Sequence, residues 1–253
     1  MMALAADGGG DRKYFSSMPI WGTLIAGLLL FLATAAVSVW QNSRLAVLFD
    51  LTSVLENAYR ISLGQIPYRD FPFVYPPLTF LIQASVIKLG GRVYWHHIGY
   101  CAFVSGAATV LTWRIVLNSL RPMPYANIIA FVLSLPLIAL GIYCVYPHPF
   151  YDPDCTFVVL LSFFLVQHFG RPDKSVLARF FTGLTVAIPV FIKQNVGLAF
   201  FALTCGALLF LSIMEVIRKR QSGCGVILMG ALMGLLIGAL LIGLPDLMAK
   251  SPS

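Results

Sequence analysis

Apolar runs long enough to cross a lipid bilayer recur along most of this 253-residue sequence, and they limit its fold more than any other feature. The first run, residues 20–40, contains no charged side chain, and a helix needs about 20 such residues to span the hydrocarbon core. Overall, 59% of the residues are hydrophobic and 11% are charged, and the mean hydropathy is +0.86. These values exclude an ordinary soluble domain and predict an all-α, polytopic transmembrane helix bundle.

The later apolar runs are also expected to form helices that cross the bilayer. They occupy residues 98–117, 125–146, 155–170, 177–192, 196–217 and 224–244. Together with the first run they make about seven spans. The sequence shows no internal repeat and no soluble segment of domain size, so we expect residues 1–253 to form a single membrane domain.

The region between the first two spans has a different character. Residues 41–75 are expected to form an outer loop, in which apolar side chains between Leu45 and Tyr59 recur at helical spacing. This pattern predicts an amphipathic helix lying on the membrane surface. Residues 76–89 open with Pro76-Pro77 and are too short for a full span, so we expect a re-entrant helix that does not cross. The helix bundle is then expected to occupy residues 76–244.

A proline-rich segment, residues 64–78, joins the surface helix to the short helix. Pro67, Pro72, Pro76 and Pro77 exclude a regular helix or a central strand there. Residues that precede proline favour extended backbone, so we expect a fixed, extended loop. Its backbone groups cannot face lipid, because they would lack hydrogen-bond partners. The loop must lie in water, at the interface or against protein.

Basic residues predict the orientation. The net charge of +7 comes from Lys and Arg between the apolar runs, as the positive-inside rule requires, and no basic stripe or motif indicates nucleic-acid binding. Arg12 and Lys13 place a short tail, residues 1–19, in the cytoplasm. If residues 76–89 do not cross, three later basic clusters are also cytoplasmic, whereas Lys88 and Arg92 are outside. The proline-rich segment, residues 146–154 and the turn 193–195 then meet on the outer face.

Several motifs resemble those of a known superfamily. Phe49-Asp50, the segment GQIPYRDF at residues 64–71 and YPPL at residues 75–78 resemble the first outer loop of GT-C glycosyltransferases. Tyr151-Asp152 and Lys193-Gln194 are similar to later motifs of that superfamily. The resemblance covers roughly residues 20–200, and it is the order and spacing of these short motifs that makes it specific.

The resemblance implies an inverting glycosyltransferase that moves a sugar from a polyprenyl-phosphate carrier to an acceptor at the outer face of a bacterial inner (plasma) membrane. Asp50 is expected to be the general base, with Asp70 as the alternative, because the attacking hydroxyl must lose a proton. Lys193 is expected to hold the phosphate. The remaining expected substrate-binding residues are Tyr68, Arg69, Tyr75, Tyr151, Asp152 and Gln194. The sugar and the glycan, lipid or protein acceptor are not specified.

Each of these residues also has a purely structural interpretation. Asp50 could cap the surface helix, and Asp70 could pair with Arg69 or Arg60 to fix the loop. Lys193 could be a helix-end lysine that reaches for the interface. The aromatic residues Tyr68, Phe71, Phe73 and Tyr75 could form an interfacial belt instead of a sugar platform.

No cofactor is required by the sequence, although a divalent metal ion is one alternative. His148 and Asp154 lie in one short loop with Asp152, and such side chains can ligate hard or borderline metals. Three prolines make the same loop equally suitable as a rigid turn, so these two residues are weak metal candidates.

Two functions other than catalysis remain open. GT-C members usually carry more spans than this sequence, and often a further outer domain. The chain could therefore be a fragment, a short member, or a non-catalytic truncated relative that acts as a scaffold or partner. A lipid or solute transporter is less well supported, since intramembrane ionisable residues are few and no repeated half is evident.

Overall fold

The computed structural model describes residues 20–45, 48–121, 123–171, 173–218 and 223–249, and all the regular structure in these ranges is helical, with no strand. The predicted N-terminal tail, residues 1–19, lies outside the described residues. Four helices are long and apolar enough to cross a membrane. They are α1 (Ile20–Asn42), α4 (Tyr94–Leu120), α10 (Gln194–Ile217) and α11 (Cys224–Ala249). An all-α membrane protein is thus confirmed.

The three other predicted spans are helical but interrupted or shorter. Residues 126–145 form α5 (Ala126–Ser134), α6 (Leu137–Leu140) and α7 (Ile142–Val145). Pro136 has no N–H for a helical hydrogen bond, and Gly141 is extended, so the run breaks at both positions. The next two are α8 (Tyr151–Phe169) and α9 (Val176–Ala187), which continues as the 3₁₀ turn η1 (Ile188–Phe191) around Pro189. Seven crossings are therefore not established.

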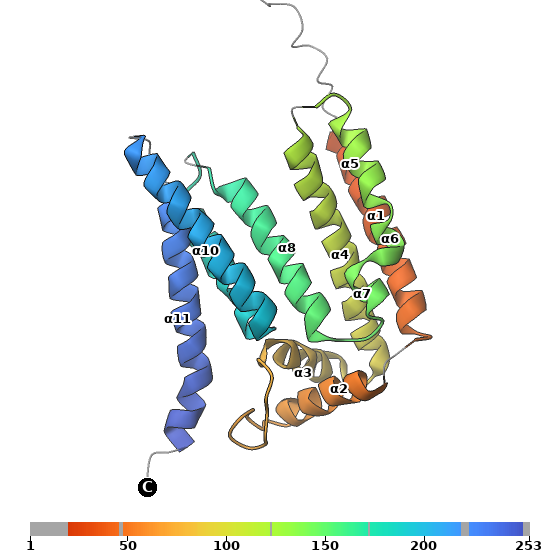
Figure 1. Ribbon diagram of the computed structural model, residues 1–253. Coiled ribbons are helices and arrows are strands. Elements are labelled where there is room, and N and C mark those ends of the chain that lie inside the picture. Colours follow the sequence, from red (N-terminus) through yellow and green to blue (C-terminus); the bar gives the residue numbers. More distant parts are fainter. Residues whose placement is uncertain (1–19, 46–47, 122, 172, 219–222, 250–253) are drawn as a thin grey trace, which may run out of the picture.

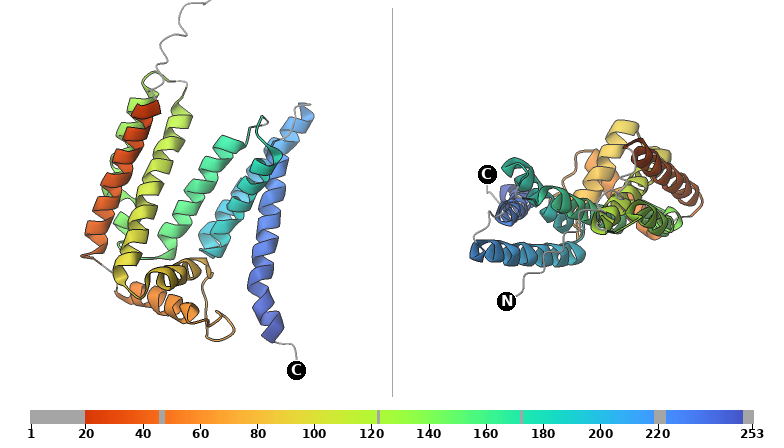
Figure 2. Two further views of the ribbon diagram at one scale, coloured as in Figure 1. Left: turned by 180° about the vertical axis from the view of Figure 1, so that it is seen from behind. Right: turned by 90° about the horizontal axis from the view of Figure 1, so that it is seen from above.

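The long helices form two groups joined by α8 (Figures 1 and 2). In the first group α1 and α5 pack on α4, and in the second α9 and α10 pack on α11. Helix α8 contacts α4 on one side and α9 on the other. Helix α1 finishes at one end of the bundle, and helices α4, α8 and α10 begin at that same end (Figure 1).

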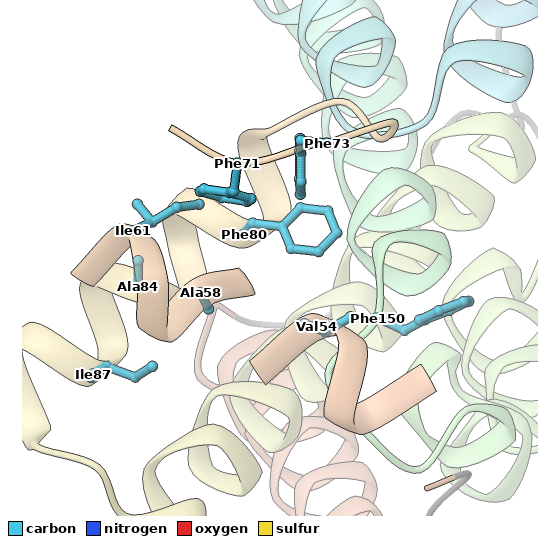
Figure 3. Close-up of a cluster of buried hydrophobic side chains, with 9 residues drawn as sticks. All are labelled: Val54, Ala58, Ile61, Phe71, Phe73, Phe80, Ala84, Ile87 and Phe150. Atoms are coloured by element: carbon cyan, nitrogen blue, oxygen red, sulfur yellow. The ribbon is translucent and has the colours of Figure 1, made fainter. Parts of the chain in front are cut away.

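Two shorter helices, α2 (Leu48–Ser62) and α3 (Leu78–Gly90), lie across that end rather than alongside the long helices (Figure 1). They pack on each other through a shared hydrophobic cluster (Figure 3). Its buried members are Val54, Ala58, Ile61, Phe71, Phe73, Phe80, Ala84, Ile87 and Phe150. The position of α3 agrees with the prediction that residues 76–89 do not span, because α4 starts from the end at which α1 stops.

The proline-rich segment follows α2. Gly64 has a positive φ of 93°, which suits glycine, and the helix ends just before it, as the sequence predicted. The expectation of an extended loop is wrong for residues 67–71, where Tyr68 has a φ of 68° and Pro67 is bridged to Phe71. The turn closes because the N–H of Asp70 donates to the carbonyl of Ile66 at 2.9 Å.

Candidate functional site

The proline-rich segment, the start of α8 and the turn before α10 meet at one place. The rings of Tyr75 and Tyr151 stack with centroids 5.5 Å apart and planes 28° apart. The ammonium group of Lys193 lies 5.5 Å from the centroid of the Tyr151 ring and forms an ion pair with the carboxylate of Asp152. Residues separated by more than a hundred positions in the sequence thus share one site, and the structure brings together four of the residues that the sequence singled out.

A cavity of about 310 Å³ lies beside this group. It is lined by Val74, Tyr75, Pro76, Tyr151, Ile192, Lys193, Gln194 and Asn195. Its volume is at the lower end of the range for small-molecule pockets, about 300–1,000 Å³. Two tyrosines and apolar side chains line it together with the polar side chains of Lys193, Gln194 and Asn195. Asn195 was not singled out from the sequence, although it directly follows Lys193-Gln194.

The polar residues of the cavity favour an anion. Helix α10 begins at Gln194 and runs 24 residues, so its free N–H groups and its dipole present positive charge where Lys193 also lies. The carboxylate of Asp152 now neutralises Lys193, and each of the two side chains keeps about a quarter of its surface exposed. An anionic ligand could therefore replace Asp152 as the partner of Lys193 without exposing a deeply buried charge.

Asp50 lies in the first turn of α2 and is partly exposed. Burial lowers the pKa of His148 and raises that of Tyr151, and the charge of Asp50 raises the pKa of both to a smaller extent. Val54, one turn further along the same face of α2, packs in one cluster with Phe150 (Figure 3). Asp50 does not line the cavity, and the first turn is also a position in which an acidic residue stabilises a helix.

Asp70 is bonded within its own loop and does not line the cavity. Its carboxylate accepts hydrogen bonds from Arg69 Nε at 2.8 Å, Arg69 Nη2 at 3.0 Å and the N–H of Ile66 at 2.7 Å. The bond from Arg69 and then that from Ile66 lower the pKa of Asp70, and the bond to Asp70 raises the pKa of Arg69. A carboxylate stabilised in this way is a weak base, and the structural interpretation describes this pair better.

The aromatic residues of the proline-rich segment divide into two kinds. Phe71 and Phe73 are buried in the cluster between α2 and α3. Tyr68 and Tyr75 are exposed, and the Tyr68 hydroxyl donates to the carbonyl of Tyr75 at 2.5 Å. Tyr75 therefore reaches the cavity, whereas Tyr68 supports the backbone from which Tyr75 projects.

Asp154 lies beneath the site and is 2% exposed. Its carboxylate accepts hydrogen bonds from Tyr143 at 2.5 Å, Tyr100 at 2.7 Å and Thr79 at 2.8 Å. Helices α3, α4, α7 and α8 are thus tied together at one carboxylate. This junction could not be predicted from the sequence, because the three hydroxyl residues carry no motif of their own.

The weak metal candidates His148 and Asp154 are not grouped with further ligands among the described residues. Within the described ranges no group of three or more His, Cys, Asp or Glu side chains is placed to hold a metal ion. His148 is buried at 1% exposure, and the carboxylate of Asp154 already accepts hydrogen bonds from hydroxyl groups.

The chain matches no protein-family model, no curated protein and no solved structure.

Proposed function

We propose that this protein transfers a sugar from a polyprenyl-phosphate carrier to a hydroxyl acceptor at the non-cytoplasmic face of a membrane. The observation that carries the proposal is the cavity in which stacked tyrosines adjoin Lys193 and the N-terminus of α10. Tyrosine faces suit a sugar ring, and the positive charge suits the phosphate. The resemblance of residues 64–78, Tyr151-Asp152 and Lys193-Gln194 to GT-C motifs supports the same function.

In this proposal each residue has one role. The acceptor oxygen bonds to the anomeric carbon while the bond from that carbon to the phosphate oxygen breaks, and the electron pair remains on the phosphate. Asp50 takes the proton of the acceptor hydroxyl, and Lys193 stabilises the charge that grows on the leaving oxygen. Asp152, released from Lys193 by the phosphate, accepts a hydrogen bond from a sugar hydroxyl. The configuration at the anomeric carbon inverts, because a single displacement occurs.

We further propose that the chain crosses a bacterial inner membrane seven times and that the site lies on the outer side. The positive-inside rule supports this orientation, since the loops at the end of the bundle away from α2 and α3 carry the basic residues Arg121, Arg171, Lys174 and Arg218 (Figure 1).

Labelling of single cysteines tests the orientation. In a variant lacking the native cysteines, we expect Gln65→Cys and Asn195→Cys to react with an impermeant reagent on intact cells, because both side chains are exposed at the end that carries the site. Lys174→Cys, at the opposite end, should react only after the membrane is opened. The reverse pattern would contradict an outward-facing site.

Reconstitution tests the proposed activity. The full chain in liposomes is supplied with a panel of polyprenyl-phosphate sugars, and release of polyprenyl phosphate and labelling of an acceptor are measured. We expect release with at least one donor. If none of the donors is used while the protein remains folded and binds a full-length transferase, the non-catalytic scaffold would be supported instead.

Replacement of Lys193 tests its proposed role in holding the phosphate. Lys193→Ala should lower the transfer rate by about 10²–10³-fold, because it removes an electrostatic group aimed at the leaving oxygen. It should also weaken donor binding, since the phosphate is charged before and after transfer. Lys88→Ala is the matched control, because Lys88 is an exposed lysine on α3 outside the cavity. Equal activity of the two variants would remove Lys193 from the site.

A further inference from the structure

Lys193 would meet a different phosphate before and after the proposed transfer. In the donor the phosphate is a diester with one negative charge, whereas the released polyprenyl phosphate is a monoester with a charge of about −1.5 to −2 at pH 7. The ammonium group of Lys193 and the N-terminus of α10 attract the monoester more strongly than the diester. A site built from these groups alone would therefore retain its product and exclude the next donor.

A competing anion lies beside Lys193. The carboxylate of Asp152 forms an ion pair with the ammonium group, and each of the two side chains is 24% exposed. Asp152 is not among the residues that line the cavity, whereas Lys193 is, so the carboxylate acts on the cavity through this ion pair. A ligand phosphate and the Asp152 carboxylate thus compete for one ammonium group.

The carboxylate of Asp152 is also favourably placed when the ion pair opens. Asp152 lies in the first turn of α8, a helix of 19 residues whose N-cap residue, Phe150, offers no side-chain hydrogen bond. A helix dipole stabilises a carboxylate at this end. Asp154, in the same turn, already accepts bonds from three hydroxyl groups, so it cannot take the place of Asp152. Asp152 can therefore leave Lys193 and return to it.

We propose that Asp152 makes the site discriminate against its own product. The inference rests on the proposed function, in which a hydroxyl of the donor sugar holds the Asp152 carboxylate while the phosphate holds Lys193. Transfer removes that hydroxyl together with the sugar. Asp152 then returns to Lys193 and displaces the polyprenyl phosphate. Asp152 is thus a specificity-determining residue, which lowers the affinity for the product but not the affinity for the donor.

Binding of farnesyl phosphate tests the competition without any transfer. This short-chain monoester represents the product, and its affinity for the full chain in detergent is measured by titration calorimetry. We expect Asp152→Asn to bind it about 2–5-fold more tightly than the wild type, because an amide does not form the ion pair that a partly exposed carboxylate forms with Lys193. Asp152→Glu keeps a carboxylate and should retain the affinity of the wild type.

Asp173→Asn is the matched control. It removes the same functional group from another ion pair with a lysine, Asp173–Lys174, in the loop between α8 and α9 at the opposite end of the bundle (Figure 1). This variant should bind farnesyl phosphate as the wild type does. An unchanged affinity in Asp152→Asn, or an equal gain in Asp152→Asn and Asp173→Asn, would overturn the inference.

Donor binding separates the discrimination from a general effect of charge. The affinity for the donor, measured without an acceptor, should not increase in Asp152→Asn, because the amide oxygen still accepts a hydrogen bond from the sugar. A gain for the donor equal to that for farnesyl phosphate would contradict the inference, since a charge effect alone tightens both.

Turnover completes the test. In the reconstituted system the first turnover of Asp152→Asn should run at close to the wild-type rate, and later turnovers should be slower because the product leaves more slowly. The value of kcat should thus fall with kcat/KM nearly unchanged. Wild-type steady-state turnover in Asp152→Asn would overturn the inference alone. A wild type that is inactive with every donor would overturn the proposed function, and the discrimination with it.

Discussion

Replacing Asp50 by asparagine is expected to lower the rate of sugar transfer by about 10²–10⁴-fold, the usual contribution of a general base. Asparagine keeps the size of the side chain and much of its hydrogen bonding, but it cannot take a proton. Asp50 lies in the first turn of α2 and is not among the residues that line the cavity. Expression and donor binding should therefore stay close to those of the wild type, and rapid-quench and donor-binding measurements would separate the two effects.

The matched control is Asp70→Asn, which changes the same functional group in the neighbouring loop. Asp70 is engaged by Arg69 and by the N–H of Ile66, so its loss should alter the loop more than the chemistry. Comparable rate losses in both variants would indicate a general effect of charge at this face. A large loss in Asp70→Asn with none in Asp50→Asn would transfer the role of base to Asp70, and Asp50 would only stabilise the start of its helix.

The two functional substitutions should also differ in kind. Asp50→Asn is expected to be a rate defect, since proton removal occurs only during transfer. Lys193→Ala is expected to reduce both binding and rate, because the phosphate carries charge throughout. This difference gives a signature that a loss of folding would not reproduce.

The coarse architecture could be predicted because it depends on local features. Long apolar runs predict the long helices, and the shortness of residues 76–89 predicts a helix that does not run with them. The period of apolar residues after Leu45 anticipated α2, whose buried face carries Val54, Ala58 and Ile61. Pro136 and Gly141 could have indicated the break in the run at residues 125–146, but that run was assigned as one span from its apolar length alone.

The details of the site depend on contacts between distant residues, and these have no local signature. The sequence predicted that Asp152 and Lys193 share one face, yet it could not show that they pair with each other across 41 positions. It left Asp70 undecided between base and loop partner, because the turn at Tyr68 that brings Asp70 to Ile66 requires an uncommon positive φ.

The bonds of Asp154 likewise join distant residues and have no local signature. Replacing Asp154 should cause the largest change in stability that we expect. Asp154→Ala would leave the hydroxyl of Tyr100 without its acceptor, while Tyr143 keeps the carbonyl of Phe150 at 3.3 Å and Thr79 could turn to the backbone of its own helix. An unpaired buried hydroxyl costs about 1–3 kcal/mol, so we expect a loss of about that size. The apparent Tm in detergent would report it, with a fall of roughly 2–12 °C for a chain of this size.

Two variants separate the hydrogen bonds from the mere loss of a carboxylate. Asp154→Asn keeps an oxygen that accepts, and a hydroxyl can itself accept from the new amide, so its Tm should fall between that of Asp154→Ala and the wild type. Asp152→Ala removes a carboxylate from the same turn of α8, but one whose partner is the part-exposed Lys193, so the stability should change by only about 0–1 kcal/mol. Equal falls in Tm for the alanine variants at 152 and 154 would contradict the hydroxyl junction. A fall confined to position 154 would show that one buried carboxylate holds α3, α4 and α7 against the start of α8.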